Sequence, residues 1–276
     1  MKWWCSASDA AWEWHWRPYP GVWLFLLLLF WIYRRAWRNA SGPDLVRRPI
    51  AYGLGMAALW VAVDWPLGPL GAGYLLSAHT ISFILLSLVA PPLLLLGLPR
   101  GALTLEQGRF QTHLLRFLAA PLPALVLFNG ILALTHLPDF VDGWMRSQGG
   151  AFGTDMTWLL GGLILWWPVF APRPAIGRLS EPAQMGYLFV ASILPTVPAM
   201  MLVFADYPLY GLYELSPRVF DILNAHNDQQ LAGLLMKVIG DIPLWAGFGA
   251  VFFRWQRHET GSTPPAPSQT DRWIDG

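Results

Sequence analysis

The sequence has few charged residues and almost no cysteine. Asp, Glu, Lys and Arg make up 13% of its 276 residues, whereas soluble domains carry about 25%. The single cysteine, Cys5, excludes an internal disulfide, a cysteine-based zinc site and an iron–sulfur cluster. The net charge of +1 leaves no basic surface for nucleic acid. A soluble enzyme, a disulfide scaffold and a nucleic-acid-binding protein are therefore excluded.

Apolar and aromatic residues are abundant instead. Hydrophobic residues make up 55% of the chain, and tryptophan occurs 17 times. Tryptophan concentrates at membrane interfaces, and a helical membrane span needs roughly 20 mostly apolar residues. We expect seven spans, near residues 19–32, 50–63, 70–98, 117–136, 152–170, 184–205 and 229–253. The sequence therefore predicts an all-α membrane protein with a bundle of seven transmembrane helices.

The distribution of Lys and Arg predicts how this bundle is oriented. Loops after the first, third and fifth spans, together with the C-terminal tail, hold thirteen of these residues, against four on the other side. Because cytoplasmic loops are enriched in Lys and Arg, we expect the N-terminus outside and the C-terminus in the cytoplasm. The expected domains are a transmembrane domain over residues 1–257 and a disordered, Pro- and Ser-rich cytoplasmic tail over 258–276.

Polar residues gather near the outer ends of the predicted spans, where they indicate a site because they are unfavourable in lipid. Imidazole and thioether groups are copper ligands, and thioether favours the cuprous state. The candidate metal ligands are His79, His136, His226, Met236, Asp64 and Asp139. The alternatives are a structural histidine that binds a neighbouring carbonyl, a solvated loop histidine at position 226 and methionine as core filler.

Further polar or soft residues accompany this set. His79 lies nine residues after Leu70, which predicts a depth of roughly 13 Å in the third span. Met200 and Met201 lie near the outer end of the sixth span, and Cys5 falls in a terminus that we expect to be disordered. Lys237 and Asp241 are four residues apart and share a helix face. They form either a structural ion pair or a pair with a proton-relay or docking role.

Several motifs resemble the CtaG family of integral membrane cytochrome c oxidase assembly factors. They are Asp64-Trp-Pro-Leu-Gly, Gly73-Tyr-Leu-Leu-Ser-Ala-His79, Val89-Ala-Pro-Pro, Thr135-His-Leu-Pro-Asp139, Trp166-Trp-Pro168 and Asp228-Gln-Gln-Leu-Ala-Gly-Leu-Leu-Met236. They touch spans two to seven in the family's order. The resemblance implies a non-enzymatic role, a multi-pass protein of the bacterial cytoplasmic (inner) membrane, and a partner in the haem–copper oxidase catalytic subunit.

The resemblance also implies copper as the possible cofactor or cargo, delivered as by a chaperone to the copper beside the oxidase's high-spin haem. The family's third span commonly reads His-x-x-x-His; here His79 matches the first histidine, and Phe83 stands at the second. Two alternative functions are a membrane copper transporter and a haem-binding membrane oxidoreductase. A transporter would need ligands across the bilayer, and spans three to six hold no histidine below mid-depth.

Overall fold

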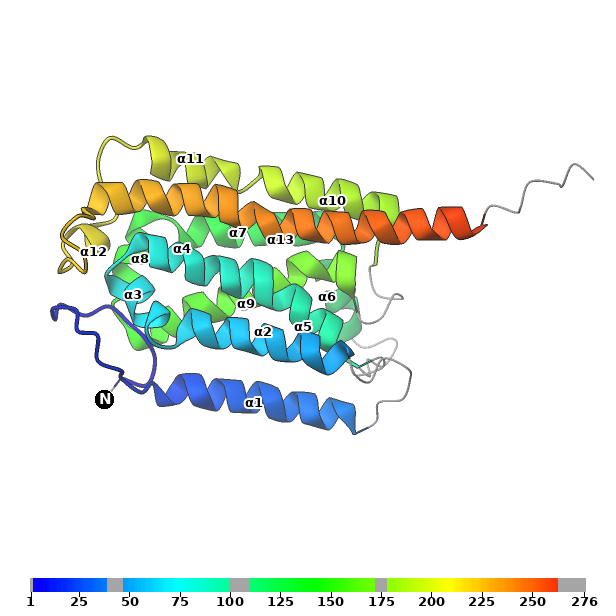
Figure 1. Ribbon diagram of the computed structural model, residues 1–276, viewed down its shortest axis with the longest axis horizontal. Coiled ribbons are helices and arrows are strands. Elements are labelled where there is room, and N and C mark those ends of the chain that lie inside the picture. The colour runs from blue at the N-terminus through cyan, green and yellow to red at the C-terminus, as the bar shows by residue number, and fades with distance from the viewer. Residues whose placement is uncertain (1, 39–46, 100–109, 172–177, 263–276) are drawn as a thin grey trace, which may run out of the picture.

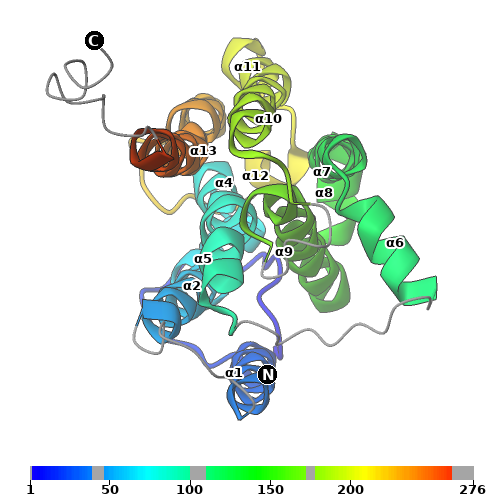
Figure 2. The same cartoon turned by 90° about the vertical axis from the view of Figure 1, so that its right-hand side faces the viewer.

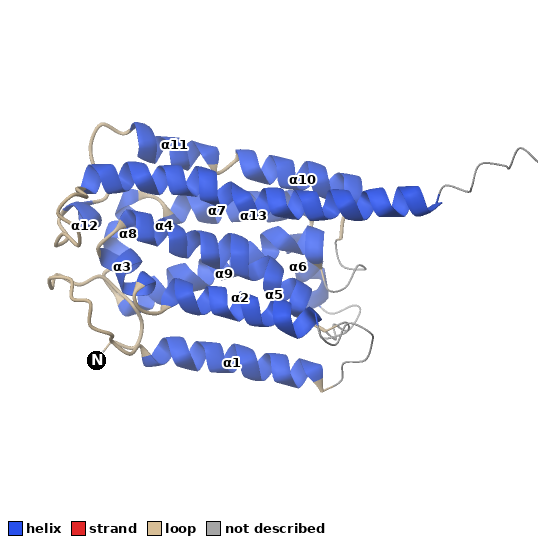
Figure 3. Ribbon diagram, in the orientation of Figure 1, coloured by secondary structure: helices blue, strands red, loops and turns tan. Residues whose placement is uncertain are grey.

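The computed structural model describes residues 2–38, 47–99, 110–171 and 178–262, and within these ranges all regular structure is helical (Figure 3). The all-α prediction is therefore confirmed. The elements are α1 (Pro20–Trp37), α2 (Arg47–Val63), α3 (Leu67–Gly73), α4 (Leu76–Ile84), the π-helix η1 (Leu85–Val89), α5 (Ala90–Gly97), α6 (Phe110–Leu118), α7 (Pro121–Thr135), α8 (Pro138–Trp144), α9 (Gln148–Phe170), α10 (Glu181–Ile193), α11 (Thr196–Phe204), α12 (Gly211–Glu214) and α13 (Ala225–Ser262).

The long helices run side by side along the longest axis of the molecule (Figure 1). The continuous helix α4–η1–α5 is the core element, because α2, α9 and α13 all pack against parts of it (Figure 2). Residues 2–19, α3, α8 and α12 lie together at one end of the bundle, which we call the N-terminal end. This end includes Asp139 in α8, and α3 packs there against α4, whose first turn carries His79.

Three helices are long and apolar enough to cross a membrane: Leu76–Gly97, Glu181–Phe204 and Ala225–Thr260. Two bent pairs, α2 with α3 and α7 with α8, raise the number of candidate spans in the described ranges to five. The protein is thus a membrane protein. The total of seven spans and their orientation remain predictions.

The predicted third span is shorter than its apolar run. Leu75 is extended, with φ −132° and ψ 123°, and separates α3 from α4. The apolar run of the sequence continues through this break because Leu67–Gly73 is apolar. Three of the seven residues in this segment are glycine, and glycine disfavours a continuous helix. The span therefore begins at Leu76, and His79 lies in its first turn rather than nine residues inside it.

The same span contains a five-residue π-helix, Leu85–Val89. Such wide turns are rare insertions within α-helices. Helix α9 approaches this turn closely at Gly162, where a Cβ atom would lie 2.3 Å from the Ser87 carbonyl oxygen. A glycine at this position is therefore needed for α9 to pack against the π-helix.

The N-terminal segment is folded, contrary to the expected disorder around Cys5. Trp4 is completely buried and Cys5 is 3% exposed. The Trp4 indole donates to Asp155 over 2.7 Å, and the Cys5 thiol donates to the Val63 carbonyl over 3.2 Å. These contacts hold residues 2–19 over the end of the bundle. At the other terminus, α13 extends into the predicted tail as far as Ser262, and the tail's later residues lie outside the described ranges.

Candidate functional site

Two of the six predicted ligands come together in the bundle. His79, in the first turn of α4, and His136, directly after α7, have ring centroids 6.1 Å apart at an interplanar angle of 69°. Their exposed fractions are 2% and 8%. Residues 57 positions apart in the chain thus form one buried pair, which we call the histidine pair.

Aromatic rings enclose the histidine pair. The Trp158 ring lies 4.8 Å from that of His79, and the Phe83 ring lies 5.2 Å from that of His136. Tyr213 contacts His79 at a centroid distance of 5.9 Å. Phe83 therefore faces His136 from the position at which the family commonly has its second histidine.

The hydrogen bonds of His136 determine which ring nitrogen is available. Its Nδ1 atom lies 2.9 Å from the Leu132 carbonyl oxygen. Because a carbonyl only accepts, Nδ1 carries the proton, and Nε2 has a free lone pair. Nε2 of His136 and Nε2 of His79 are both buried without a hydrogen-bond partner among the described residues. Buried polar groups are usually paired, so these two neighbouring rings each keep one unused buried nitrogen.

Two tyrosines hold the backbone beside the histidines. The Tyr210 hydroxyl donates to the His136 carbonyl over 2.8 Å, and the Tyr213 hydroxyl donates to the Gly71 carbonyl over 2.6 Å. A Cβ atom on Gly71 would lie 2.9 Å from the His79 backbone, so α3 packs directly against the ligand-bearing turn. Burial raises the pKa of both tyrosines, which keeps their hydroxyls protonated as donors.

Asp228 fixes the first turn of α4. Its carboxylate accepts hydrogen bonds from the backbone N–H of Leu76 over 2.6 Å, from that of Ser77 over 3.3 Å, and from the Ser77 hydroxyl. The first N–H groups of a helix lack partners within that helix, and a carboxylate there also complements the helix dipole. Asp228, on α13, therefore caps the N-terminus of α4. The capped residue Leu76 lies three residues before His79.

In the part of the chain that it describes, the structure shows no contact between the other predicted ligands and the histidine rings. Nε2 of His226 lies 2.9 Å from the Ala205 carbonyl oxygen, and Asp139 is exposed in the first turn of α8. Met236 is buried on α13, which packs against α4. Within the described ranges, no group of three or more His, Cys, Asp and Glu side chains is placed to hold a metal ion.

Asp64 belongs to a second buried polar centre, with Cys5. It accepts from the Trp60 indole over 2.6 Å, and its other oxygen has no partner among the described residues. Burial and the carboxylates of Asp155 and Asp64 raise the pKa of the Cys5 thiol. Since the thiolate is the metal ligand, this environment disfavours metal binding by Cys5.

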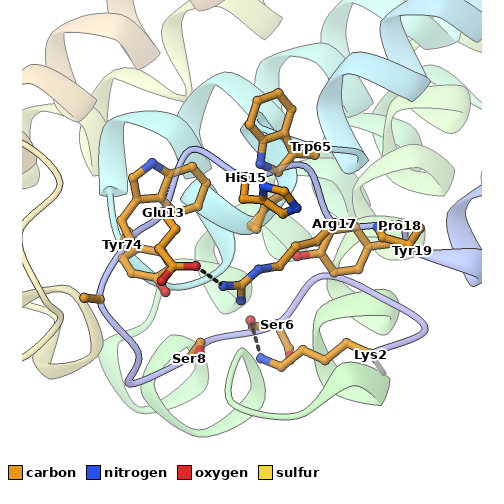
Figure 4. A pocket seen from close by; sticks show the side chains of 13 residues that line it. Lys2, Ser6, Ser8, Glu13, His15, Arg17, Pro18, Tyr19, Trp65 and Tyr74 are labelled. Carbon is orange, nitrogen blue, oxygen red and sulfur yellow. Dashed lines mark hydrogen bonds and ion pairs between the residues drawn. The ribbon is translucent and has the colours of Figure 1, made fainter.

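A surface pocket of about 390 Å³ lies between the N-terminal segment and α3 (Figure 4). Its charged groups already have partners: the Lys2 ammonium donates to the Ser6 carbonyl over 3.0 Å, and Arg17 pairs with Glu13 over 3.2 Å. Burial also lowers the pKa of Lys2. This pocket is separate from the histidine pair in residues and in chemistry.

The predicted ion pair of α13 forms. Lys237 Nζ lies 2.8 Å from Asp241 and donates to the Ser192 carbonyl of α10 over 3.2 Å. Ser192 comes just before the break at Leu194–Pro195 between α10 and α11. The ammonium therefore satisfies a helix-end carbonyl and a carboxylate together.

The motifs carrying the family resemblance now have places in the fold. The family model for the cytochrome c oxidase caa3 assembly factor, Caa3_CtaG, matches residues 27–258. The chain belongs to this family. The match includes both histidines, Phe83 and the Asp228 cap, and confirms the resemblance stated from the motifs. Neither a curated protein nor a solved structure matches the chain significantly.

A caa3 assembly factor has cytochrome c oxidase as its partner. Sequence reasoning identified both histidines but missed Tyr210 and Tyr213, whose hydrogen bonds join residues 74 and 142 positions apart. It noted Asp228 as a polar residue before the seventh span and as part of a motif, but nothing in the local pattern links that residue to Leu76.

Proposed function

We propose that this caa3 assembly factor assists copper insertion into the haem–copper oxidase catalytic subunit, with the histidine pair as its cuprous site. The observation that carries the proposal is the pair of unpartnered, buried Nε2 atoms on adjacent rings. Metal–imidazole nitrogen distances are about 2 Å, so one ion between two rings fits centroids 6.1 Å apart. Copper is cargo in this proposal, and the protein acts as a chaperone rather than an enzyme.

The proposed orientation places the histidine pair near the outer surface of the bacterial cytoplasmic membrane. Helices α1 and α9, of 18 and 23 residues, run beside the five candidate spans (Figure 1), and in this proposal they are the sixth and seventh. The C-terminal end of α1, which carries Arg34 and Arg35, and the N-terminal end of α2 lie opposite the N-terminal end of the bundle (Figure 1). With the positive charges inside, His79 and His136 lie in the outer half, where copper arriving from outside reaches them.

The surroundings of the pair give each protein group a role. His79 and His136 bind the ion, and neutral imidazole lone pairs suit the cuprous state. Trp158 and Phe83 exclude water and anionic ligands from the ion. Tyr210, Tyr213 and Asp228 fix the backbones on which the two imidazoles are carried, so the site is organised before copper arrives.

The haem-binding alternative is disfavoured by packing. A macrocycle ligated by His79 and His136 would have to displace Trp158 and Phe83, which lie within about 5 Å of these rings. The transporter alternative needs further copper ligands along the bilayer. The polar residue that follows Met236 on α13 is Lys237, whose ammonium is paired with Asp241 and Ser192 and has no lone pair for copper.

The test is anaerobic cuprous titration of the detergent-purified protein, followed by metal analysis and an optical spectrum. One copper per chain, bound more weakly after substitution of either histidine, supports the proposal. No copper retained by the wild-type chain overturns it, and a Soret band on the protein as isolated favours the haem alternative. In cells, a deletion strain with normal oxidase copper content, tested with any paralogue also deleted, overturns the insertion role.

A further inference from the structure

An apolar groove of about 380 Å³ lies between α7 and the broken helix α10–α11, beside the histidine pair. Most of its walls are aliphatic, including Leu132 of α7 and Val197 of α11. Only a few side chains bring it a hetero atom: Asn129, Tyr210, His136 and Met201. The first donates its amide to Leu125 of its own helix, and the second donates its hydroxyl to His136. The imidazole and the thioether are therefore the two side-chain groups of this groove whose chemistry suits a cuprous ion.

The exposures of these two groups give the groove a direction. His136 is 8% exposed, and its Nε2 is shielded from solvent without a partner, whereas Met201 is 61% exposed. Val197, one helical turn before Met201, is 68% exposed on the same helix. The groove thus runs from the buried His136 to the exposed surface of α11.

We propose that this groove is the lateral route by which a cuprous ion leaves the histidine pair, with His136 at its inner end and the Met201 thioether as the ligand at its open end. The proposal rests on the proposed copper function and adds a residue and a direction to it. Thioether binds copper in its cuprous state and carries no charge, so it suits a position between an imidazole and a partner protein within the bilayer.

The neighbouring methionine provides a matched control. Met200 packs against the hydrophobic core and does not line the groove. Met and Leu have similar volume, and exchanging them is usually well tolerated. Met201→Leu therefore removes the sulfur at the groove, and Met200→Leu removes a sulfur one residue away.

The experiment measures how fast copper is extracted from the loaded full chain in nanodiscs. Neocuproine, a chelator that enters the bilayer, is compared with bathocuproine disulfonate, which stays in water. We expect Met201→Leu to slow extraction by neocuproine about tenfold, the equivalent of about 1.4 kcal/mol. Met200→Leu should match the wild type, and Met201→His should restore the rate because imidazole replaces the thioether.

A spectroscopic readout tests the ligand directly. In His79→Ala loaded at saturating cuprous ion, one imidazole of the pair is missing, so copper should move along the groove to Met201, and X-ray absorption at the copper edge should detect a sulfur neighbour. That signal should vanish in His79→Ala with Met201→Leu and persist in His79→Ala with Met200→Leu.

The outcomes separate this proposal from the one on which it rests. If wild-type protein retains no copper, the copper function itself fails. If it retains copper on the histidine pair, but Met201→Leu changes neither extraction nor sulfur scattering, the lateral route is wrong and the copper function stands. Equal effects of Met200→Leu and Met201→Leu also overturn the route, as does faster extraction by the water-soluble chelator in every variant.

Discussion

The histidine pair and the Lys237–Asp241 pair are both polar centres within the helix bundle, and they differ in how completely they are satisfied. Lys237 donates to Asp241 and to Ser192, so its charge is neutralised and its neighbouring helix break is capped. His79 and His136 each keep a buried Nε2 atom without a partner among the described residues. The first centre thus stabilises the fold, and the second keeps binding capacity for something else.

The largest effect is expected at the satisfied centre. Lys237→Met leaves the Asp241 carboxylate and the Ser192 carbonyl without their donor. The two side chains are 31% and 18% exposed, and an unpaired charge left within a membrane helix costs about 3 kcal/mol, so the thermal unfolding midpoint in detergent should fall clearly. Replacing the pair together, with Lys237→Met and Asp241→Leu, should recover most of the loss, and an unchanged midpoint in Lys237→Met would contradict a structural role.

The next effect concerns binding rather than folding. His79→Ala should weaken cuprous affinity by about two orders of magnitude, equivalent to about 2.8 kcal/mol, with little change in protein abundance. His226→Ala is the control, because that imidazole already pairs with the Ala205 carbonyl. A competitive titration against a cuprous chelator measures the affinity of both variants. Equal affinities in the two variants would show that copper does not bind at the histidine pair.

Asp228 links the two kinds of centre, because its satisfied bonds position an unsatisfied group. Asp228→Ala leaves the N-terminal N–H groups of α4 unpaired and should cost about 2 kcal/mol of stability. It should also weaken cuprous affinity, although it contacts no metal ligand side chain. Measuring cuprous affinity at a temperature well below the unfolding midpoint separates the two effects. Wild-type affinity at that temperature would mean that Asp228 contributes to stability only.

The smallest expected effect comes from a substitution that adds a ligand to the histidine pair. Phe83 faces His136 at a centroid distance of 5.2 Å, so Phe83→His places a third imidazole beside the pair. We expect cuprous affinity to rise about tenfold, near 1.4 kcal/mol. X-ray absorption should report three nitrogen neighbours, and a lower affinity with two neighbours would mean that the ring turns away.

Much of this architecture follows from local pattern, and the site follows from it only in part. Apolar runs predicted the helices because each run carries its own signal. The break at Leu75 was missed because Leu67–Gly73 is as apolar as a span, although its glycines pointed to the break. His79 and His136 were selectable because imidazole is rare in apolar runs. These two histidines lie side by side, whereas His226 binds the Ala205 carbonyl and Asp139 is exposed. This arrangement depends on how the helices pack, and the sequence of one span does not determine that packing.

The π-helix at Leu85–Val89 has a consequence for how this chain tolerates insertions and deletions. Each residue added to or removed from an α-helix rotates everything beyond it by about 100°. A chain one residue shorter within this turn would close it into ordinary α-helix, and His79 and Phe83 would then rotate relative to α5. Either the contact of α5 with α2 and α9 or the placement of His79 beside His136 would be lost. The number of residues in this turn is therefore constrained by the packing on both sides of it.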